Sequence, residues 1–266
     1  MGPKDLITSS QSSLELKPKR SLGQNFFTNP NLALRIAEIV TSESPELVIE
    51  VGPGTGVFTK IFQEKHKVIA IEKDDQLAEM LQNRFIDTVE IINMDVLDVK
   101  IGVIDDMVNK HTIDGKAVVF GSLPYNVSKR IIEYLIQIRS CDNFYYIIQK
   151  EVAEKYISPK NSVLKARTDI FCNSRIVMNI NPGNFNPKPK VTSSLINFSK
   201  TETPLLNKEN YEEFKKFLSL AFRSPRKTLY NNLKGSSYQI PIDHPLAKER
   251  AEDLPTETLC QIFTRV

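Results

Sequence analysis

Short apolar runs alternate with helical patterns from residue 47 to about residue 157, and this alternation restricts the fold more than any other feature of the sequence. The apolar runs are rich in β-branched and aromatic residues, as expected of buried strands, and cover residues 47–52, 67–72, 89–93, 117–123 and 143–149. Helical patterns occupy residues 55–65, 76–85 and 128–139 and begin again at Lys150. Strands that alternate with helices form a parallel sheet with both faces covered. Such sheets bind ligands at the carboxyl ends of their strands.

The pattern changes after Arg175. Residues 175–180 and 193–198 are two further β-rich runs, and the segment GNFNPKPKV between them contains two prolines that stiffen a loop. These runs predict an antiparallel hairpin. The predicted fold class is therefore α/β, with a Rossmann-like sheet that is mostly parallel and has a C-terminal antiparallel strand.

From residue 203 onward the chain shows helical patterns only. Apolar residues recur at i, i+3, i+4 and i+7 in Phe214, Phe217, Leu218 and Ala221. The polar segment 201–208 is the predicted linker to a small all-helical part. The predicted organisation is a disordered tail over residues 1–16, an α/β domain over 17–202 and a helical domain over 203–266.

Composition excludes several classes of protein. The chain has 266 residues and a formal net charge of +3, and its apolar runs are all shorter than the roughly 20 residues that span a bilayer. The three cysteines and three histidines are scattered, so they indicate neither a disulfide framework nor a metal site. We expect a cytoplasmic protein with reduced thiols, no bound metal and no membrane association.

The segment EVGPGTG (50–56) follows a predicted strand and opens a predicted helix. A glycine-rich turn in this position lets a ligand approach the backbone closely and exposes N–H groups at the helix start. In the dinucleotide-binding pattern GxGxxG, the third glycine would fall on Val57, so the sequence fits GxGxG instead. This form, preceded by an acidic residue, resembles the cofactor loop of class I methyltransferases.

Acidic residues follow the next two strands. Glu72 ends the run 67–72, where a carboxylate can accept hydrogen bonds from both ribose hydroxyls of a nucleoside. Asp95 follows the run 89–93 and can accept a hydrogen bond from an adenine amino group beside the Val96 backbone. Because the glycine turn and both acids stand at successive strand ends, we interpret them as one cofactor site.

The segment GSLPYNVS (121–128) follows the fourth strand and is the candidate catalytic loop. The exocyclic amine of adenine is a poor nucleophile, and acceptors for its protons stabilise the charge that develops on nitrogen. Ser122 and the carbonyls of Leu123 and Pro124 can serve as such acceptors, and the Tyr125 ring can stack on a base taken out of its helix. This chemistry requires neither a general base nor a metal.

Eight motifs together carry a specific resemblance. The sequence resembles the rRNA adenine N6,N6-dimethyltransferases, in particular the small-subunit, KsgA-type group, from Lys19 to about Lys234. The matching segments are KRSLGQNFF (19–27), EVGPGTG (50–56), IEKD (71–74), NMDVLD (93–98), SLPYNVS (122–128), IIQKEVAEK (147–155), FNPKPKVTSSLI (185–196) and AFRSPRKTLYNNLK (221–234). The resemblance implies S-adenosylmethionine as methyl donor and dimethylation of two adjacent adenines near the 3′ end of small-subunit rRNA during ribosome biogenesis.

The resemblance also implies roles for individual residues. It implies that Gln24, Asn25 and Phe27 cover the cofactor and that Gly52 and Gly54 lie against its methionine end. It places Glu72 on the ribose, Asp95 and Val96 at the cofactor adenine and Tyr125 against the target base. The family motif usually reads Asn-Leu-Pro-Tyr or Asn-Leu-Pro-Phe, and in this sequence Ser122 replaces the asparagine, so we expect an active but slower enzyme.

Basic residues gather in three segments that can contact RNA phosphates. Residues 215–234 contain six lysines and arginines and no acidic residue. The Pro-rich segment GNFNPKPKV (183–191) and the segment before the glycine turn, the N-terminal arm (residues 17–29), add others. The principal candidates are Lys188, Lys190, Arg223, Arg226 and Lys227, with Lys215, Lys216, Lys234, Lys17, Lys19 and Arg20 as further members of the basic segments.

Two alternatives to a monomeric small-subunit enzyme remain open. One is a resistance-type methyltransferase that modifies adenine in large-subunit rRNA. The other is a ribosome-assembly or RNA-binding factor that keeps the fold without catalysis, for which Ser122 is the supporting feature. The FNPKPKVTSS and RKTLYNNLK segments favour the small-subunit enzyme, and Glu72, Asp95 and the Leu-Pro-Tyr segment favour catalysis.

Overall fold

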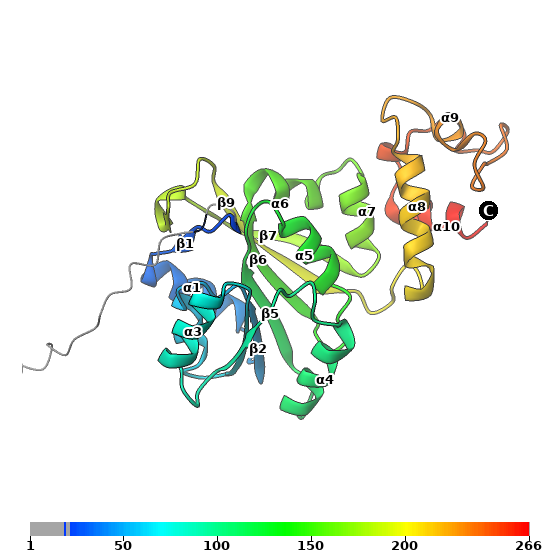
Figure 1. Ribbon diagram of the computed structural model, residues 1–266. Coiled ribbons are helices and arrows are strands. Elements are labelled where there is room, and N and C mark those ends of the chain that lie inside the picture. Colours follow the sequence, from blue (N-terminus) through cyan, green and yellow to red (C-terminus); the bar gives the residue numbers. More distant parts are fainter. Residues whose placement is uncertain (1–18, 20–21, 266) are drawn as a thin grey trace, which may run out of the picture.

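The computed structural model describes residue 19 and residues 22–265 (Figure 1). Its centre is a seven-stranded sheet. The strands lie in the order β4 (Glu90–Asn93), β3 (Lys67–Glu72), β2 (Leu47–Val51), β5 (Ala117–Ser122), β6 (Asn143–Gln149), β9 (Ser193–Lys200) and β7 (Cys172–Ile180). The proposed N-terminal tail over residues 1–16, Lys17 and Arg20 lie outside the described residues.

The sheet confirms the predicted fold class. Strands β4, β3, β2, β5 and β6 pair in parallel, whereas β9 pairs antiparallel with both β6 and β7. The strand order reverses between β2 and β5, which is where a ligand site is expected. The strand β7 begins three residues earlier than the prediction, at Cys172, because it pairs with the full length of β9.

Helices cover both faces of the sheet. Alternate strand residues separate the core into two layers: Leu47, Ile49 and Val51 pack on one face, and Val48 packs on the other. The first face is covered by α4 (Ile101–His111), α5 (Ser128–Leu135), α6 (Lys150–Ile157) and α7 (Val163–Asp169). The second face is covered by α1 (Pro30–Val40) and α2 (Val57–Phe62), while α3 (Asp75–Arg84) contacts β3 and β4.

Two predicted helices are shorter in the structure. The helix α2 begins at Val57 rather than at residue 55 because Gly56 is left-handed, with φ of +77°, and ends the glycine turn. The helix α5 ends at Leu135, and residues up to 139 form a loop in which Asp105 accepts the backbone N–H of Arg139. The helices α1, α4 and α7 were not predicted from the sequence.

The N-terminal arm is tied to the loop between β7 and β9. The short strand β1 (Phe26–Phe27) pairs antiparallel with β8 (Phe185–Asn186) in that loop. Two hydrogen bonds reinforce the pairing, because the Asn184 carbonyl accepts the Thr28 N–H at 2.8 Å and its side chain accepts from Asn29 at 2.8 Å. Residues 22–27 of the arm line the same cavity as the residues at the carboxyl ends of β2, β3 and β5.

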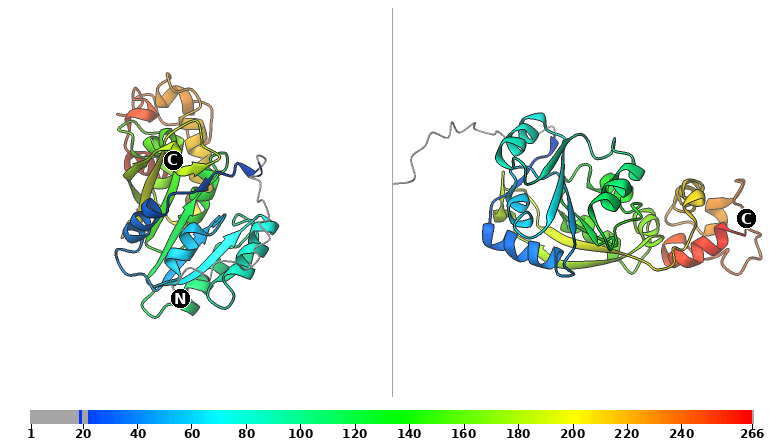
Figure 2. Two further views of the ribbon diagram at one scale, coloured as in Figure 1. Left: turned by 90° about the vertical axis from the view of Figure 1, so that its left-hand side faces the viewer. Right: turned by 90° about the horizontal axis from the view of Figure 1, so that it is seen from below.

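The C-terminal residues are helical, as the sequence pattern predicts. They form α8 (Tyr211–Ala221), α9 (Leu229–Leu233) and α10 (Thr256–Phe263). All four apolar residues of the periodic pattern in α8 are buried. Figures 1 and 2 show these helices on the side of α7, away from the N-terminal arm.

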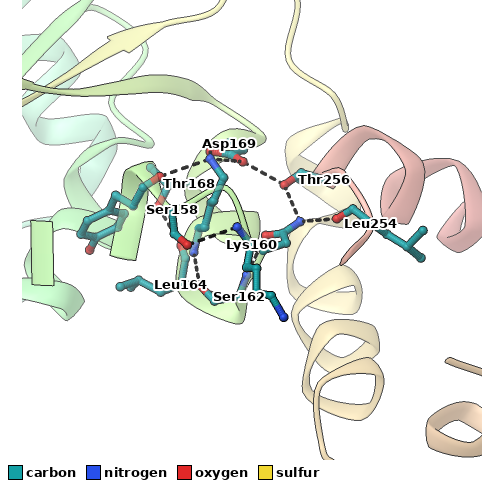
Figure 3. Close-up of polar contacts among 11 residues, drawn as sticks. Ser158, Lys160, Ser162, Leu164, Thr168, Asp169, Leu254 and Thr256 are labelled. Carbon is teal, nitrogen blue, oxygen red and sulfur yellow. Dashed lines mark hydrogen bonds and ion pairs between the residues drawn. The ribbon is translucent and has the colours of Figure 1, made fainter. Parts of the chain in front are cut away.

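A buried polar network joins the C-terminal helices to the α/β part (Figure 3). The Asn161 amide, in the loop before α7, donates to the Leu254 carbonyl at 3.0 Å and to the Thr256 hydroxyl at 3.1 Å. The Thr256 hydroxyl in turn donates to Asp169 at 2.9 Å, and the Asn161 N–H reaches the Glu252 carbonyl at 2.7 Å. These hydrogen bonds fix α10 against α7.

Candidate active site

A cavity of about 220 Å³ opens at the carboxyl ends of the central strands. Its walls are the turn after β2, the ends of β3 and β5, the loops that follow β4 and β5, and the N-terminal arm. It brings together every predicted cofactor and catalytic residue, namely Gln24, Asn25, Phe27, Gly52, Gly54, Glu72, Asp95, Val96, Ser122, Leu123, Pro124 and Tyr125.

The glycine turn leaves open space beside its backbone. Gly52 has φ of +67°, which L side chains rarely adopt, and a Cβ at this position would meet no atom within 4 Å. The space beside Gly52 is therefore the cavity itself. Gly56 serves packing instead, because a Cβ there would come within 2.8 Å of Leu81 in α3. Gly54 lies against the Phe26 ring of the arm, which a Cβ at Gly54 would approach to 3.1 Å.

Glu72 holds the turn and faces the cavity. Its carboxylate accepts the Gly54 N–H at 3.1 Å and the Asp74 N–H at 2.9 Å, and the residue is 6% exposed. Burial raises the pKa of Glu72, while these two N–H groups oppose the shift. Each carboxylate oxygen accepts one backbone N–H and keeps further lone pairs for ligand hydroxyls.

Asp95 is engaged by a lysine that the sequence reasoning did not assign. Lys73 donates to Asp95 at 2.7 Å, and both residues line the cavity. Burial raises the pKa of Asp95, but the Lys73 hydrogen bond and the Leu97 N–H outweigh it, so the pKa lies below its ordinary value. Asp95 is therefore ionised at neutral pH and keeps acceptor capacity beside Val96.

Asp74 anchors the N-terminal arm. Its carboxylate accepts hydrogen bonds from the Lys19 ammonium at 2.7 Å and the Gln24 amide at 2.9 Å, and it caps α3 through the Gln76 N–H. Burial raises the pKa of Asp74, but these partners outweigh it and lower the pKa overall. Asp74 belongs to the IEKD segment but has no role assigned from the sequence, because the helix begins one residue earlier than the pattern predicts, at Asp75, which makes Asp74 its N-cap. Lys19 is thus an arm anchor.

The three residues that were predicted to cover the cofactor, Gln24, Asn25 and Phe27, make different contacts. Gln24 lines the cavity, yet its side chain also accepts the Lys19 N–H at 2.7 Å, so it shapes the arm. Asn25 donates to the Gly23 carbonyl at 3.2 Å and lines the cavity as well. Phe27 is 5% exposed and packs against Phe58 and Phe185, so most of its ring belongs to the core.

The loop after β5 places its acceptors at the cavity. Ser122 is opposite Ile147 on β6, and the Leu123 N–H donates to the Ile147 carbonyl at 3.1 Å. Within the described residues, neither the Ser122 hydroxyl nor the Leu123 carbonyl has a hydrogen-bond partner. The Pro124 carbonyl, in contrast, accepts the N–H groups of Val127 at 3.2 Å and Ser128 at 3.0 Å. The geometry therefore favours Leu123 over Pro124 as the backbone acceptor for an amine.

Tyr125 lines the cavity and is held at its far end. Its hydroxyl lies 2.7 Å from the Ser193 hydroxyl, on the first residue of β9. Burial raises the pKa of Tyr125, so the phenol is neutral at physiological pH. Ser193 lies in the segment FNPKPKVTSSLI, but the sequence assigns it no role. Its contact with Tyr125 joins residues that are far apart in the sequence, and such contacts leave no local sequence signal.

The basic residues differ in how far they are free to bind phosphate. Lys215 and Lys216 form ion pairs with Glu212 and Glu213 at 2.7 and 2.8 Å, so their ammonium groups already have acidic partners. The Arg223 guanidinium donates to a backbone carbonyl at 3.2 Å and remains exposed.

The remaining candidates are exposed and lack acidic partners within 4 Å in the part of the chain that the structure describes. These residues are Lys188, Lys190, Arg226, Lys227 and Lys234. Lys188 and Lys190 lie in the loop between β8 and β9, whereas the other three lie near α9. Two separate exposed basic segments are therefore available to RNA.

The residues present fit an adenosyl cofactor. The open space at Gly52, the buried acceptor Glu72 after β3 and the ionised Asp95 after β4 are the groups that a nucleoside with a charged tail requires. No group of three or more His, Cys, Asp or Glu residues able to hold a metal occurs among residues 22–265 or at residue 19. Fold and site together define a class I, S-adenosylmethionine-dependent methyltransferase.

A family model described as ribosomal RNA adenine dimethylase matches residues 15–266. Because this match covers nearly the whole sequence, the chain belongs to that family.

Curated relatives extend over the same length. The chain is 32% identical to ribosomal RNA small subunit methyltransferase A of Ureaplasma parvum serovar 3, with 98% of each chain covered. It is 34% identical to the protein of that name from Pelagibacter ubique, over 80% of this chain and 82% of the relative.

Two solved structures share the fold. A dimethyladenosine transferase from Plasmodium falciparum has a TM-score of 0.72 at 23% identity, covering 90% of this chain and 96% of its own. The 23S rRNA methyltransferase ErmE has a TM-score of 0.67 at 21% identity, covering 91% and 99%.

Proposed function

We propose that the protein transfers methyl groups from S-adenosylmethionine to N6 of two adjacent adenines near the 3′ end of small-subunit rRNA, giving N6,N6-dimethyladenosine during ribosome biogenesis. One observation carries this proposal: a single cavity joins the nucleoside acceptor Glu72 to the Ser-Leu-Pro-Tyr loop in a member of the adenine dimethylase family. Relatives named as small-subunit methyltransferases over nearly the whole chain support the choice of subunit.

The cofactor is held by side chains from three strand ends and the arm. Glu72 accepts the ribose hydroxyls, Asp95 accepts the adenine amino group beside Val96, and Gly52 leaves room for the methionine end. Asn25, together with Gln24, Phe27 and Gly54, closes the site from the arm and the turn. The cofactor, when bound, supplies a methyl group that its sulfonium makes electrophilic.

The loop after β5 activates and orients the amine. Ser122 and the Leu123 carbonyl accept the two N6 protons, and Tyr125 stacks on the base. The Pro124 ring stiffens the turn, and the Pro124 carbonyl accepts the N–H groups of Val127 and Ser128 at the start of α5. Each transfer forms a nitrogen–carbon bond, breaks a carbon–sulfur bond and releases one proton and S-adenosylhomocysteine.

Exposed basic residues bind the RNA backbone on two sides of the cavity. Lys188 and Lys190 belong to the loop that also carries β8, next to the arm, and Arg223, Arg226 and Lys227 belong to the C-terminal helical part. We propose that the protein acts as a monomer. We also propose a cytoplasmic location.

Methyl transfer to isolated ribosomal particles tests the proposal. The protein is incubated with radiolabelled S-adenosylmethionine and either immature small subunits or large subunits, and labelled nucleosides are then separated. The expected result is dimethyladenosine in small-subunit rRNA only. Label in large-subunit rRNA would replace the proposal with the resistance-type activity, and binding without transfer would indicate a non-catalytic assembly factor.

A further inference from the structure

The Tyr125 side chain is held at both ends. Its backbone belongs to the tight turn in which the Pro124 carbonyl accepts the N–H groups of Val127 and Ser128. Its hydroxyl, at the other end, lies 2.7 Å from the hydroxyl of Ser193. Ser193 is 0% exposed, so its position is fixed by the sheet around it.

The sheet explains why Ser193 reaches this loop. Ser193 is the first residue of β9 and pairs with Gln149, the last residue of β6, and with Ile180, the last residue of β7. The loop after Ser122 hydrogen-bonds to β6 through Leu123, and Tyr125 then extends past β6 to β9. The contact therefore joins the loop to a strand two positions away in the sheet.

We propose that Ser193 is a positioning residue that holds the Tyr125 ring in the orientation on which an extruded adenine stacks. This inference rests on the proposed function, because it assumes that Tyr125 receives the target base. A tyrosine anchored only through its backbone can rotate about both side-chain torsions, whereas a buried partner at the phenol oxygen fixes the direction of the ring axis. The preference of the phenol O–H for the plane of the ring then restrains rotation about that axis. A fixed ring increases the fraction of bound adenines whose amine faces its hydrogen-bond acceptors.

The hydroxyl pair holds the ring and does not carry a proton in the reaction. Burial raises the pKa of Tyr125, and no acidic or basic side chain of the described residues is hydrogen-bonded to either hydroxyl. Burial of Ser193 also means that loss of the Tyr125 hydroxyl leaves the serine without its partner. Removal of either hydroxyl therefore removes the same restraint.

The chain supplies a matched control in the next residue. Ser194 is also 0% exposed and lies on the other face of β9, where it donates to the Asn179 side chain at 2.8 Å. Ser193→Ala and Ser194→Ala thus remove one buried hydroxyl each from adjacent positions. Only the first touches the Tyr125 loop.

The experiment measures single-turnover methyl transfer to immature small subunits for Ser193→Ala, Tyr125→Phe, the double variant and Ser194→Ala. We expect each single variant to lose about tenfold in rate, the double variant to lose no more than either, and Ser194→Ala to match the wild type. Affinity for S-adenosylmethionine and for the particle should be unchanged, and the pH profile should keep its shape. Additive losses in the double variant would overturn the proposal, as would a wild-type rate in both single variants.

A second readout does not depend on catalysis. An RNA fragment with 2-aminopurine at the target adenine reports stacking through its fluorescence, and the change on binding should be smaller for Ser193→Ala than for the wild type. Tyr125→Phe reports on the same contact without altering β9, so a poorly folded Ser193→Ala protein leaves the test intact. If the wild type fails to methylate any ribosomal RNA, the proposed function fails; if the wild type is active and both variants equal it, only this inference fails.

Discussion

Replacement of Glu72 by alanine should weaken S-adenosylmethionine binding by about 100-fold. The carboxylate is buried and held by the N–H groups of Gly54 and Asp74, so it presents a fixed charged acceptor to the ribose. A hydrogen bond to a charged group contributes about 1.5–3 kcal/mol. Loss of the acceptor for two hydroxyls therefore costs about 3 kcal/mol at the lower end, which corresponds to about 100-fold in Kd.

Isothermal titration calorimetry measures this effect directly, with thermal melting to confirm that the variant folds. Glu90→Ala is the matched control, because Glu90 is an exposed carboxylate at the start of the neighbouring strand β4 and does not line the cavity. The control should bind with wild-type affinity. A Kd for Glu72→Ala within about threefold of the wild type would refute the assignment of the ribose site.

The pH dependence of binding provides a second check on Glu72. Burial raises the pKa of this carboxyl in the free protein, and the ribose hydroxyls need its ionised form. Affinity should therefore decline with falling pH, beginning at a higher pH than an ordinary glutamate would cause. Glu72→Gln should lower the affinity and remove this dependence on pH.

Three further predictions concern the amine, the RNA and stability. Ser122→Ala should slow single-turnover methyl transfer by up to about 100-fold, and Ser122→Asn should match or exceed the wild-type rate. A wild-type rate for Ser122→Ala would mean that only backbone carbonyls activate the amine. Alanine at Arg223, Arg226 and Lys227 should reduce the salt slope of RNA binding by about two to three units and spare cofactor affinity, whereas an unchanged slope would contradict phosphate contact. Burial raises the pKa of Glu50 from 4.5 to about 8, so the free energy of unfolding measured with denaturant should fall as the pH rises between these two values. Glu50→Gln should flatten this dependence on pH, and an unchanged dependence would show that another group causes it.

The central strands β2, β3, β5 and β6 were predictable because each is a continuous and mostly buried apolar run. The run at residues 143–149 matches β6 at both ends, and its residues are buried on both faces of the sheet. The helix α4 escaped prediction because only Ile104 and Val108 are fully buried in it. The late start of α2 follows from the left-handed backbone at Gly56, a property that the sequence permits but does not specify.

The site was predictable as far as motifs define it. The candidate cofactor residues Glu72 and Asp95 stand at or just after strand ends, so their register can be read from the sequence. Residues that position those groups act through contacts between distant segments, as Asp74 does with the arm. The ion pair of Lys215 was not predicted, because its partner Glu212 precedes it by three residues in the same helix and lies outside the basic segment.

Contacts between the two parts of the chain explain how RNA contacts and chemistry can cooperate. Glu133 of α5, the helix that follows the catalytic loop, accepts hydrogen bonds from Arg167 of α7 at 3.1 Å and Tyr211 of α8 at 3.3 Å. The Asn161 and Thr256 hydrogen bonds fix α10 to α7 on the same side. Breaking such half-buried polar contacts leaves unpaired groups, which opposes separation of the parts. On the proposed function, these contacts hold the basic residues of the helical part in a defined position relative to the cavity before RNA binds, which lowers the cost of ordering the site.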